Sequence, residues 1–82
     1  MDDLSRGPRE VLCIIDELYR DKVHPIVIKE IANLSDLGED RILAALARLH
    51  DLRCIKRDTT ASYMPTDLGV KLAADIRADE EA

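Results

Sequence analysis

Aromatic residues are nearly absent from this chain of 82 residues, which has no Phe, no Trp and only two Tyr. Because 46% of the residues are hydrophobic all the same, the core has to be built mainly from Ile, Leu, Val and Ala. A chain of this length forms one domain with a thin core. We therefore expect a single domain over residues 1–82, in which the acidic ends at residues 1–6 and 77–82 are frayed.

Cysteine is also scarce. The chain has only Cys13 and Cys54, which lie far apart in the sequence, and neither belongs to a CxxC pair. Each lies among aliphatic residues, where a reduced cysteine is usually a small buried hydrophobe. His24 and His50 are not at metal-ligand spacing with the cysteines or with each other. No nucleophile–base pattern, phosphate-binding loop or pair of catalytic carboxylates is recognisable. We predict a protein that uses no metal and no cofactor and is not an enzyme.

Long apolar runs are missing as well. No stretch reaches the roughly 18 apolar residues of a membrane span. The N-terminal sequence MDDLSRGP has neither the basic nor the apolar region of a signal peptide. The expectation is a soluble, cytoplasmic protein that makes no contact with a membrane.

The net charge of −5 would argue against a polyanionic partner if it were evenly spread. Between Leu4 and Ala74, however, there are 11 basic and 11 acidic residues, so the excess of acid comes from the two ends. The segment from Arg41 to Arg57 has five basic residues and only Asp51 as an acidic one. Basic charge is therefore concentrated in one segment, as binding to a polyanion requires.

Apolar residues at three- and four-residue spacing predict a first helix over residues 8–21, where Pro8 suits the first turn. A short strand near Ile26 and a second helix over residues 28–34 should follow. Val27, which precedes this second helix, is a poor N-cap residue because its side chain cannot accept a hydrogen bond.

Gly38 is an acceptable N-cap for a third helix over residues 39–52. Residues 54–65 have the pattern of an antiparallel hairpin, and Thr66 is expected to cap a fourth helix. The apolar residues that should face the core are Ile42, Leu46 and Leu49 in the third helix and Leu68, Leu72 and Ile76 in the fourth.

This order of elements resembles a winged helix-turn-helix domain. The segment IKEIANLSDLGEDRILAALARLHDLRCIKRD is similar to the helix-turn-helix core of short prokaryotic and archaeal transcription regulators of the MarR-like, PadR-like or repressor-like kinds. The segment YMPTDLGVKLA is similar to their Y-x-L-T-x-x-G signature, with Tyr63, Thr66 and Gly69 in place. The resemblance implies a mainly α fold, with a three-helix core, a two-stranded wing and a C-terminal helix. It also implies that Ala32 packs on the next helix and that Leu37 fills the turn.

The sequence departs from this family pattern at three points. Arg53 occupies the position before the wing, which is often glycine, and Pro65 stands where leucine is usual. The wing is short and lacks the Arg- and Asp-rich tip of the multiple-antibiotic-resistance regulators.

The third helix carries the candidate DNA-binding residues. Arg41, Ala45 and Arg48 are spaced i, i+4, i+7 and should form a stripe beside the buried face, with Ala44 next to it. Small alanines would let the helix approach the major groove, while the arginines reach guanine edges or phosphates. The alternative is a solvated helix face on which the arginines only maintain solubility. The predicted DNA contacts are Arg41, Ala44, Ala45, Arg48, Lys56 and Arg57, with Lys29, Asp40 and Lys71 as weaker candidates.

Glu39 and Asp40 open this helix, where carboxylates interact favourably with the helix dipole. Asp40 could instead accept a hydrogen bond from a cytosine amino group. The resemblance favours a sequence-specific regulator of transcription, a repressor that binds double-stranded DNA as a homodimer through its first and last helices. These two helices could instead bury their apolar stripes against each other. The alternative is a protein-interaction module in a transcription or replication complex.

Overall fold

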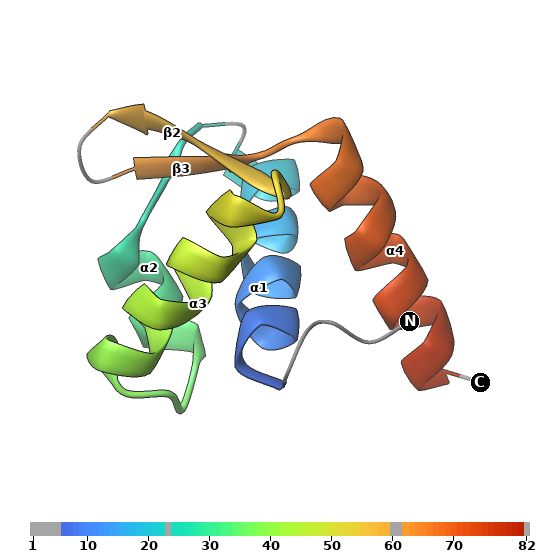
Figure 1. The fold of residues 1–82 in the computed structure, drawn as a ribbon, viewed down its shortest axis with the longest axis horizontal. Coiled ribbons are helices and arrows are strands. Elements are labelled where there is room, and N and C mark those ends of the chain that lie inside the picture. Colours follow the sequence, from blue (N-terminus) through green and yellow to red (C-terminus); the bar gives the residue numbers. More distant parts are fainter. Residues whose placement is uncertain (1–5, 23, 60–61, 82) are drawn as a thin grey trace.

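The structure is a computed structural model that describes residues 6–22, 24–59 and 62–81. The fold is mainly helical, with a small antiparallel sheet in the strand order β1-β3-β2. The sheet lies across one end of α1 and α3, and α4 runs along the other side of α1 (Figure 1). In chain order the elements are α1 (Arg6–Lys22), β1 (Ile26–Val27), α2 (Ile28–Leu34), α3 (Glu39–Asp51), β2 (Ile55–Thr59), β3 (Ser62–Pro65) and α4 (Asp67–Glu81).

The predicted order of elements is confirmed, and the predicted bounds of the second helix agree with α2. The first helix begins two residues earlier than expected, at Arg6. Val27 precedes α2 and makes no side-chain cap, because its side chain has no hydrogen-bond acceptor. Its backbone N–H donates to Glu30 Oε1 at 3.2 Å. Lys22 donates to the same carboxylate, and these two hydrogen bonds lower the pKa of Glu30.

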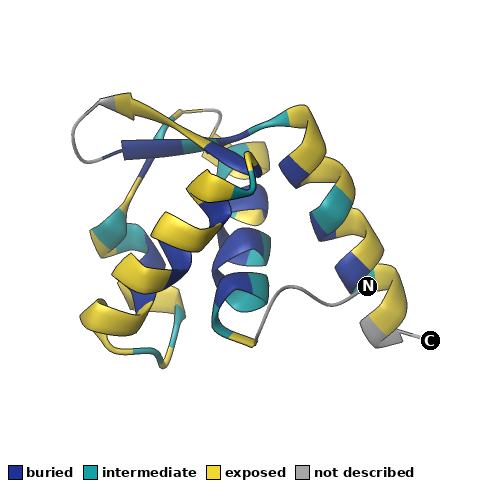
Figure 2. Ribbon diagram, viewed as in Figure 1, coloured by how far each residue is buried: buried dark blue, intermediate teal, exposed yellow. Residues whose placement is uncertain are grey.

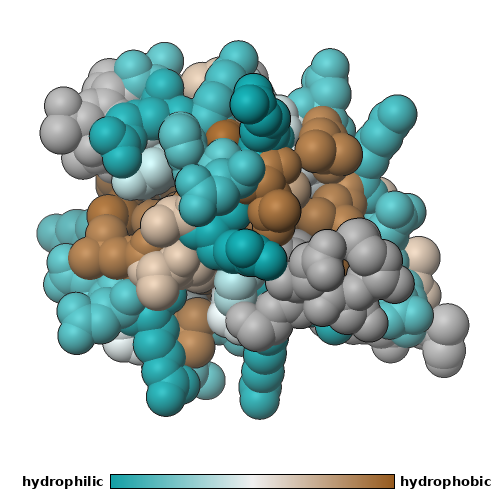
Figure 3. Space-filling model, in the orientation of Figure 1, coloured by the Kyte–Doolittle hydropathy of each residue, from teal (hydrophilic) through white to brown (hydrophobic). Residues whose placement is uncertain are grey.

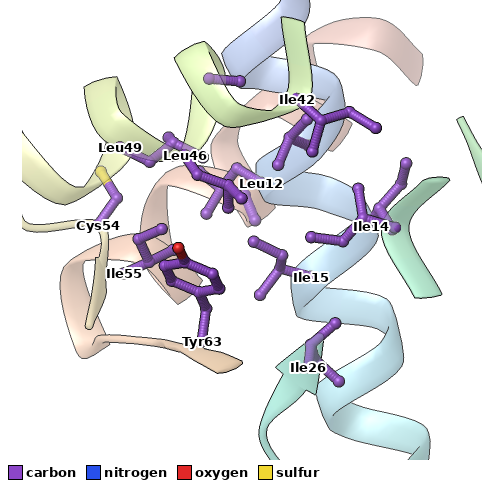
Figure 4. Close-up of a cluster of buried hydrophobic side chains, with 14 of the residues drawn as sticks. Leu12, Ile14, Ile15, Ile26, Ile42, Leu46, Leu49, Cys54, Ile55 and Tyr63 are labelled. Carbon is purple, nitrogen blue, oxygen red and sulfur yellow. The ribbon is translucent and has the colours of Figure 1, made fainter. Parts of the chain in front are cut away.

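Aliphatic side chains from α1, α3 and the sheet form the core. Leu12 and Ile15 of α1 are fully buried, as are Ile42 and Leu49 of α3. They belong to one cluster with Ile55 and Tyr63 of the hairpin, in which Ile42 lies at the end away from the hairpin (Figure 4). Burying one such side chain is worth about 1.5–3 kcal/mol, so this small aliphatic cluster holds α3 and the hairpin in a fixed relation.

Cys54 belongs to the core, where it is 1% exposed. Burial raises the pKa of its thiol, which keeps the sulfur protonated and unreactive. The prediction that this cysteine is a buried hydrophobe is confirmed, whereas Cys13 is half-buried.

The predicted buried face of the last helix is wrong at its first position. Leu68 is 53% exposed, whereas Leu72 is half-buried against the core and Ile76 is buried, as expected. Gly69 and Ala73 are the other buried residues of α4, whose buried side faces α1 (Figure 2). The reason is the close approach of α4 to the end of α3, where a Cβ on Gly69 would collide with the carbonyl group of Cys54. Small residues therefore take the inward positions that leucine spacing had suggested.

Thr66 fixes this approach with its hydroxyl group. The Oγ1 atom donates to the carbonyl of Arg53 at 2.6 Å and accepts from the N–H of Gly69 at 3.1 Å. Thr66 also donates its own N–H to the Cys54 carbonyl at 3.0 Å. The predicted cap is confirmed, and the Thr-x-x-Gly pattern has a physical reason in this contact between α4 and the end of α3.

Residues 77–81, which were expected to be frayed, belong to α4, which continues to Glu81, while Ala82 lies outside the described residues. Arg77 holds this half of the helix: its Nη1 donates to Asp16 Oδ2 at 2.8 Å, and its Nη2 donates to the Cys13 carbonyl at 3.2 Å. Asp16 is 1% exposed and also contacts Arg20 at 3.2 Å. A buried carboxylate needs such partners, since its desolvation is otherwise very unfavourable. The other predicted frayed end lies outside the described residues, except for Arg6.

A left-handed residue ends α3. Arg53 has φ of 63° and is the one non-glycine residue of the described segments with a positive φ. Its N–H donates to the His50 carbonyl, and the N–H of Cys54 donates to the Leu49 carbonyl, which together form a Schellman motif. This conformation costs an L-residue about 1–2 kcal/mol, a cost that glycine avoids.

Candidate nucleic-acid interface

The helix α3 divides into a buried and an exposed face. Ile42, Leu46 and Leu49 point into the core, and Ala45 joins them because it lies three residues after Ile42 and four before Leu49. Ala45 is 2% exposed, so the prediction that it contacts DNA is wrong. The other predicted residues of this helix, Arg41, Ala44 and Arg48, are exposed.

Arg41, Ala44 and Arg48 line one side of a groove of about 700 Å³. The opposite side is the first turn of α1, where Arg6 precedes Gly7 and Pro8, and the turn between α2 and α3 closes one end. The groove thus brings Arg6 together with Arg41 and Arg48, which follow it by 35 or more residues in the sequence. We refer to it below as the arginine groove.

Arg6 was missed by the sequence reasoning, which assigned residues 1–6 to a frayed end. The signal that could have found it is the segment RGPRE, which has a basic residue on each side of the proline expected in the first turn. A cation at the start of α1 reaches the same groove as a cation on α3 only because these two helices pack together. Sequence periodicity within one helix does not contain that information.

Two carboxylates, Glu10 and Asp36, also line the arginine groove. Glu10 Oε2 accepts a hydrogen bond from Ser35 Oγ at 2.6 Å, and Ser35 Oγ accepts one from the N–H of Leu37 at 3.1 Å. Glu10 therefore has a structural task, because it ties the turn before α3 to α1. Leu37 is half-buried against the core, as the resemblance implied, whereas Ala32 is exposed and Ile31 takes the buried position of α2.

Acidic residues occupy a different side of α3 from the arginines. At 100° per residue, Asp40 and Asp51 point almost directly away from the core, while Arg41 and Arg48 point to the flank that faces the start of α1. The positive charge of α3 is therefore confined to the arginine groove. Hydrophilic side chains cover much of this face of the molecule, with hydrophobic patches beside them (Figure 3).

The hairpin carries its two basic residues on opposite faces of the sheet. Lys56 pairs with Met64, and Arg57 pairs with Tyr63. The guanidinium carbon of Arg57 lies 5.8 Å from the centre of the Tyr63 ring, so a cation–π contact holds this side chain on the core-facing side. Both residues are exposed, but the described residues of the hairpin do not bring them into the arginine groove.

The weaker candidates are dispersed over three elements. Lys29 is exposed on α2 and Lys71 is exposed on α4, and neither lines the arginine groove. Asp40 is exposed on α3, beside the groove. Of the predicted contact residues, the structure thus brings together Arg41, Ala44 and Arg48, with the buried Ala45 at the base of the same groove, and it adds Arg6.

Two other features, a metal site and a membrane-spanning helix, are absent from the described part of the chain. Within residues 6–22, 24–59 and 62–81, no group of three His, Cys, Asp or Glu side chains could hold a metal ion. No helix of these segments is long and apolar enough to cross a membrane.

Comparison with known proteins shows similarity at the level of the fold. No family model and no curated protein matches the sequence. A protein from Archaeoglobus fulgidus has a similar structure, with a TM-score of 0.81 at 15% identity over 96% of this chain and 89% of that protein. A hypothetical protein has a TM-score of 0.82 at 22% identity over 94% of this chain, which spans about a quarter (26%) of that longer protein. At these identities the likeness shows a shared fold alone.

Proposed function

We propose that the chain is a winged helix-turn-helix domain that binds double-stranded DNA and represses transcription. The observation that carries this proposal is the arginine groove, in which Arg6, Arg41 and Arg48 converge from two helices beside the exposed Ala44. Arginine can form paired hydrogen bonds with guanine edges and with phosphates. Alanine adds little bulk, so the backbone of α3 can come close to the bases.

In this proposal α3 lies in the major groove and the β2–β3 hairpin is the wing beside the phosphate backbone. Arg41 and Arg48 are two turns, or about 10.5 Å, apart on one flank of α3, so they can reach bases or phosphates about three base pairs apart. Arg6 extends the contact to the start of α1. Asp40 and Asp51 repel phosphates and reduce non-specific affinity, so base contacts contribute more to the discrimination between sequences.

Fluorescence anisotropy with pooled mixed-sequence DNA duplexes over a salt series tests the proposal. We expect the Kd to rise steeply with salt, because each phosphate contact releases counterions. Arg41→Ala and Arg48→Ala should weaken binding to the preferred duplexes by about five- to a hundredfold. Arg6→Ala should weaken binding to all duplexes alike and reduce the magnitude of the salt slope by about one.

Arg20→Gln is the matched control, since it also removes one arginine from α1. Arg20 lies about 21 Å along the helix from Arg6, and Arg77 still holds Asp16 in its absence. This variant should bind DNA with unchanged affinity. The absence of any binding by the wild-type chain at low salt would exclude the proposed function.

A protein partner is the second candidate, favoured by the outward side of α3. Leu43 is 42% exposed there, and the outward-pointing Asp40 and Asp51 make the surface next to it acidic. An interaction module of a transcription or replication complex would bind through this surface. A chain that fails to bind DNA at low salt and captures one protein in a pull-down that Leu43→Arg abolishes would support this candidate.

We further propose that the repressor acts as a homodimer on two half-sites about one helical turn apart. The sequence reasoning assigned dimerisation to the first and last helices. In the structure α1 and α4 pack against each other within one chain, through Asp16 and Arg77 among others. The outer surface of α4, where Leu68 and Val70 are exposed, is then the part of this pair that is left for a second copy.

A further inference from the structure

The left-handed conformation of Arg53 is required by the backbone around it and not by its side chain. Its N–H donates to the His50 carbonyl at 3.0 Å, and its own carbonyl accepts from Thr66 Oγ1 at 2.6 Å. The next residue, Cys54, donates to the Leu49 carbonyl at 2.9 Å and accepts from the Thr66 N–H at 3.0 Å. All four hydrogen bonds would form equally well around a glycine, which adopts this conformation freely.

An arginine at this position is thus unfavourable for the fold, and within residues 6–22, 24–59 and 62–81 no ion pair or hydrogen bond of its guanidinium offsets that. Arg53 is exposed. A residue kept in a strained conformation without structural benefit points to a use for its side chain. The chemistry available to that side chain is the binding of a carboxylate or phosphate oxygen.

The place of Arg53 in the fold favours the phosphate. It follows the last turn of α3, whereas Arg41 is in the first turn, so the two lie about 18 Å apart along the helix. The major groove is about 12 Å wide, so a helix lying in it places cations at its two ends near the phosphates at the groove edges. Cys54 then connects Arg53 to β2, which carries the exposed Lys56 and Arg57.

We propose that Arg53 is a phosphate-binding residue of the DNA interface, held at the junction of α3 and the hairpin by its left-handed backbone. This inference rests on the proposed function, because it assigns a further contact to the same interface. Under this proposal Arg53 has two roles that can be tested separately. Its backbone conformation stabilises the junction, and its guanidinium binds a DNA phosphate.

Three substitutions at this position separate the two properties. Arg53→Gly and Arg53→Asn remove the charge and both tolerate the left-handed conformation, while Arg53→Lys retains the charge. Unfolding in urea measures the fold, and anisotropy with a mixed-sequence DNA duplex of about 20 base pairs over a salt series measures the contact. A phosphate contact is independent of base sequence, so the operator need not be known.

We expect Arg53→Gly to unfold at a higher urea concentration than the wild type and yet to bind the duplex about five- to tenfold more weakly at about 0.1 M salt. Its salt slope should be smaller in magnitude by about 0.9. Arg53→Asn should lose the same affinity, and Arg53→Lys should retain most of it. A residue with a merely structural role would not give a variant that is more stable and yet binds the duplex more weakly.

Two outcomes would overturn the inference while leaving the proposed function intact. One is wild-type affinity and salt slope in Arg53→Gly; the other is an equal loss in Arg53→Lys, which keeps the charge. Failure of the wild-type chain to bind any duplex at low salt would overturn the proposed function, and the inference with it.

Discussion

Gly69 is the residue at which the packing of this small protein is tightest. The position that a Cβ would occupy there overlaps the backbone carbonyl of Cys54, which cannot move because it accepts the N–H of Thr66. The carbonyl belongs to the junction between α3 and β2 that also holds Arg53. One residue without a side chain therefore lets α4 dock against the end of the proposed recognition helix.

Gly69→Ala should lower the free energy of unfolding by about 1–3 kcal/mol, because the added methyl group forces α4 away from the Cys54 carbonyl. Gly7→Ala is the matched control. A Cβ on Gly7 would meet Leu37 at an ordinary 3.9 Å, and the helix preference of alanine is opposed by the restriction that Pro8 imposes on the residue before it, so this variant should differ from the wild type by less than about 1 kcal/mol. Urea denaturation measures both. Equal losses in the two variants would contradict the contact described for Gly69.

Single residues differ in how well the sequence predicted them. Thr66 was predicted because its role as a helix cap is local, whereas Gly69 was noted only as part of the resemblance, since its close approach to Cys54 is a contact between distant segments. Ala45 was misassigned because alanine is compatible with either face of a helix, although its spacing from Ile42 and Leu49 places it on the buried face that packs on α1. Arg53 was noted as a departure from glycine, but its left-handed backbone becomes evident only with the hydrogen bonds of Thr66.

At the scale of elements, the attachment of α4 depends on a buried ion pair between distant parts of the chain. Asp16 of α1 and Arg77 of α4 are 61 residues apart, and the carboxylate is 2% exposed at its side chain. The sequence reasoning assigned Arg77 to a frayed end, because an acidic terminal run normally has no partner in the fold. A buried aspartate in the apolar stripe of α1 was the available signal, since such a residue needs a cation.

Arg77→Ala should lower the free energy of unfolding by about 2–3 kcal/mol. The loss of one partner leaves a buried carboxylate poorly compensated, although Arg20 still contacts Asp16. Arg9→Ala is the control: it breaks an ion pair with Asp79, whose side chain is 81% exposed, and should cost less than about 1 kcal/mol. Chemical denaturation that gives equal costs for the two variants would show that burial of Asp16 contributes nothing.

At the scale of the whole molecule, the acidic and basic side chains of α3 lie on different sides of that helix, although Glu10 and Asp36 of other elements share the groove with the arginines. Arginines converge in the groove between α1 and α3, while Asp40 and Asp51 line the outward side of α3. The net charge of −5 hides this segregation. The sequence predicted that basic charge is concentrated between Arg41 and Arg57, but the contribution of Arg6 depends on a contact between helices.

The last prediction concerns assembly, because an 82-residue chain has a thin core and still exposes Leu68 and Val70 on α4. Burying these side chains between two copies would remove apolar surface from water and set two arginine grooves at a fixed distance.

We expect light scattering to give twice the chain mass of 9.2 kDa at micromolar concentrations, and Leu68→Glu to give a single chain. The control is Leu34→Glu, which changes a leucine that is 61% exposed on α2 and should leave the dimer intact. A mass of one chain at all concentrations, or a dimer that survives Leu68→Glu, would contradict assembly through α4. If the dimer forms, Leu68→Glu should also reduce the affinity for a duplex with two half-sites. The affinity for a single half-site should be unchanged, because residues of α1, α3 and the turn before α3 line the arginine groove and Leu68 does not.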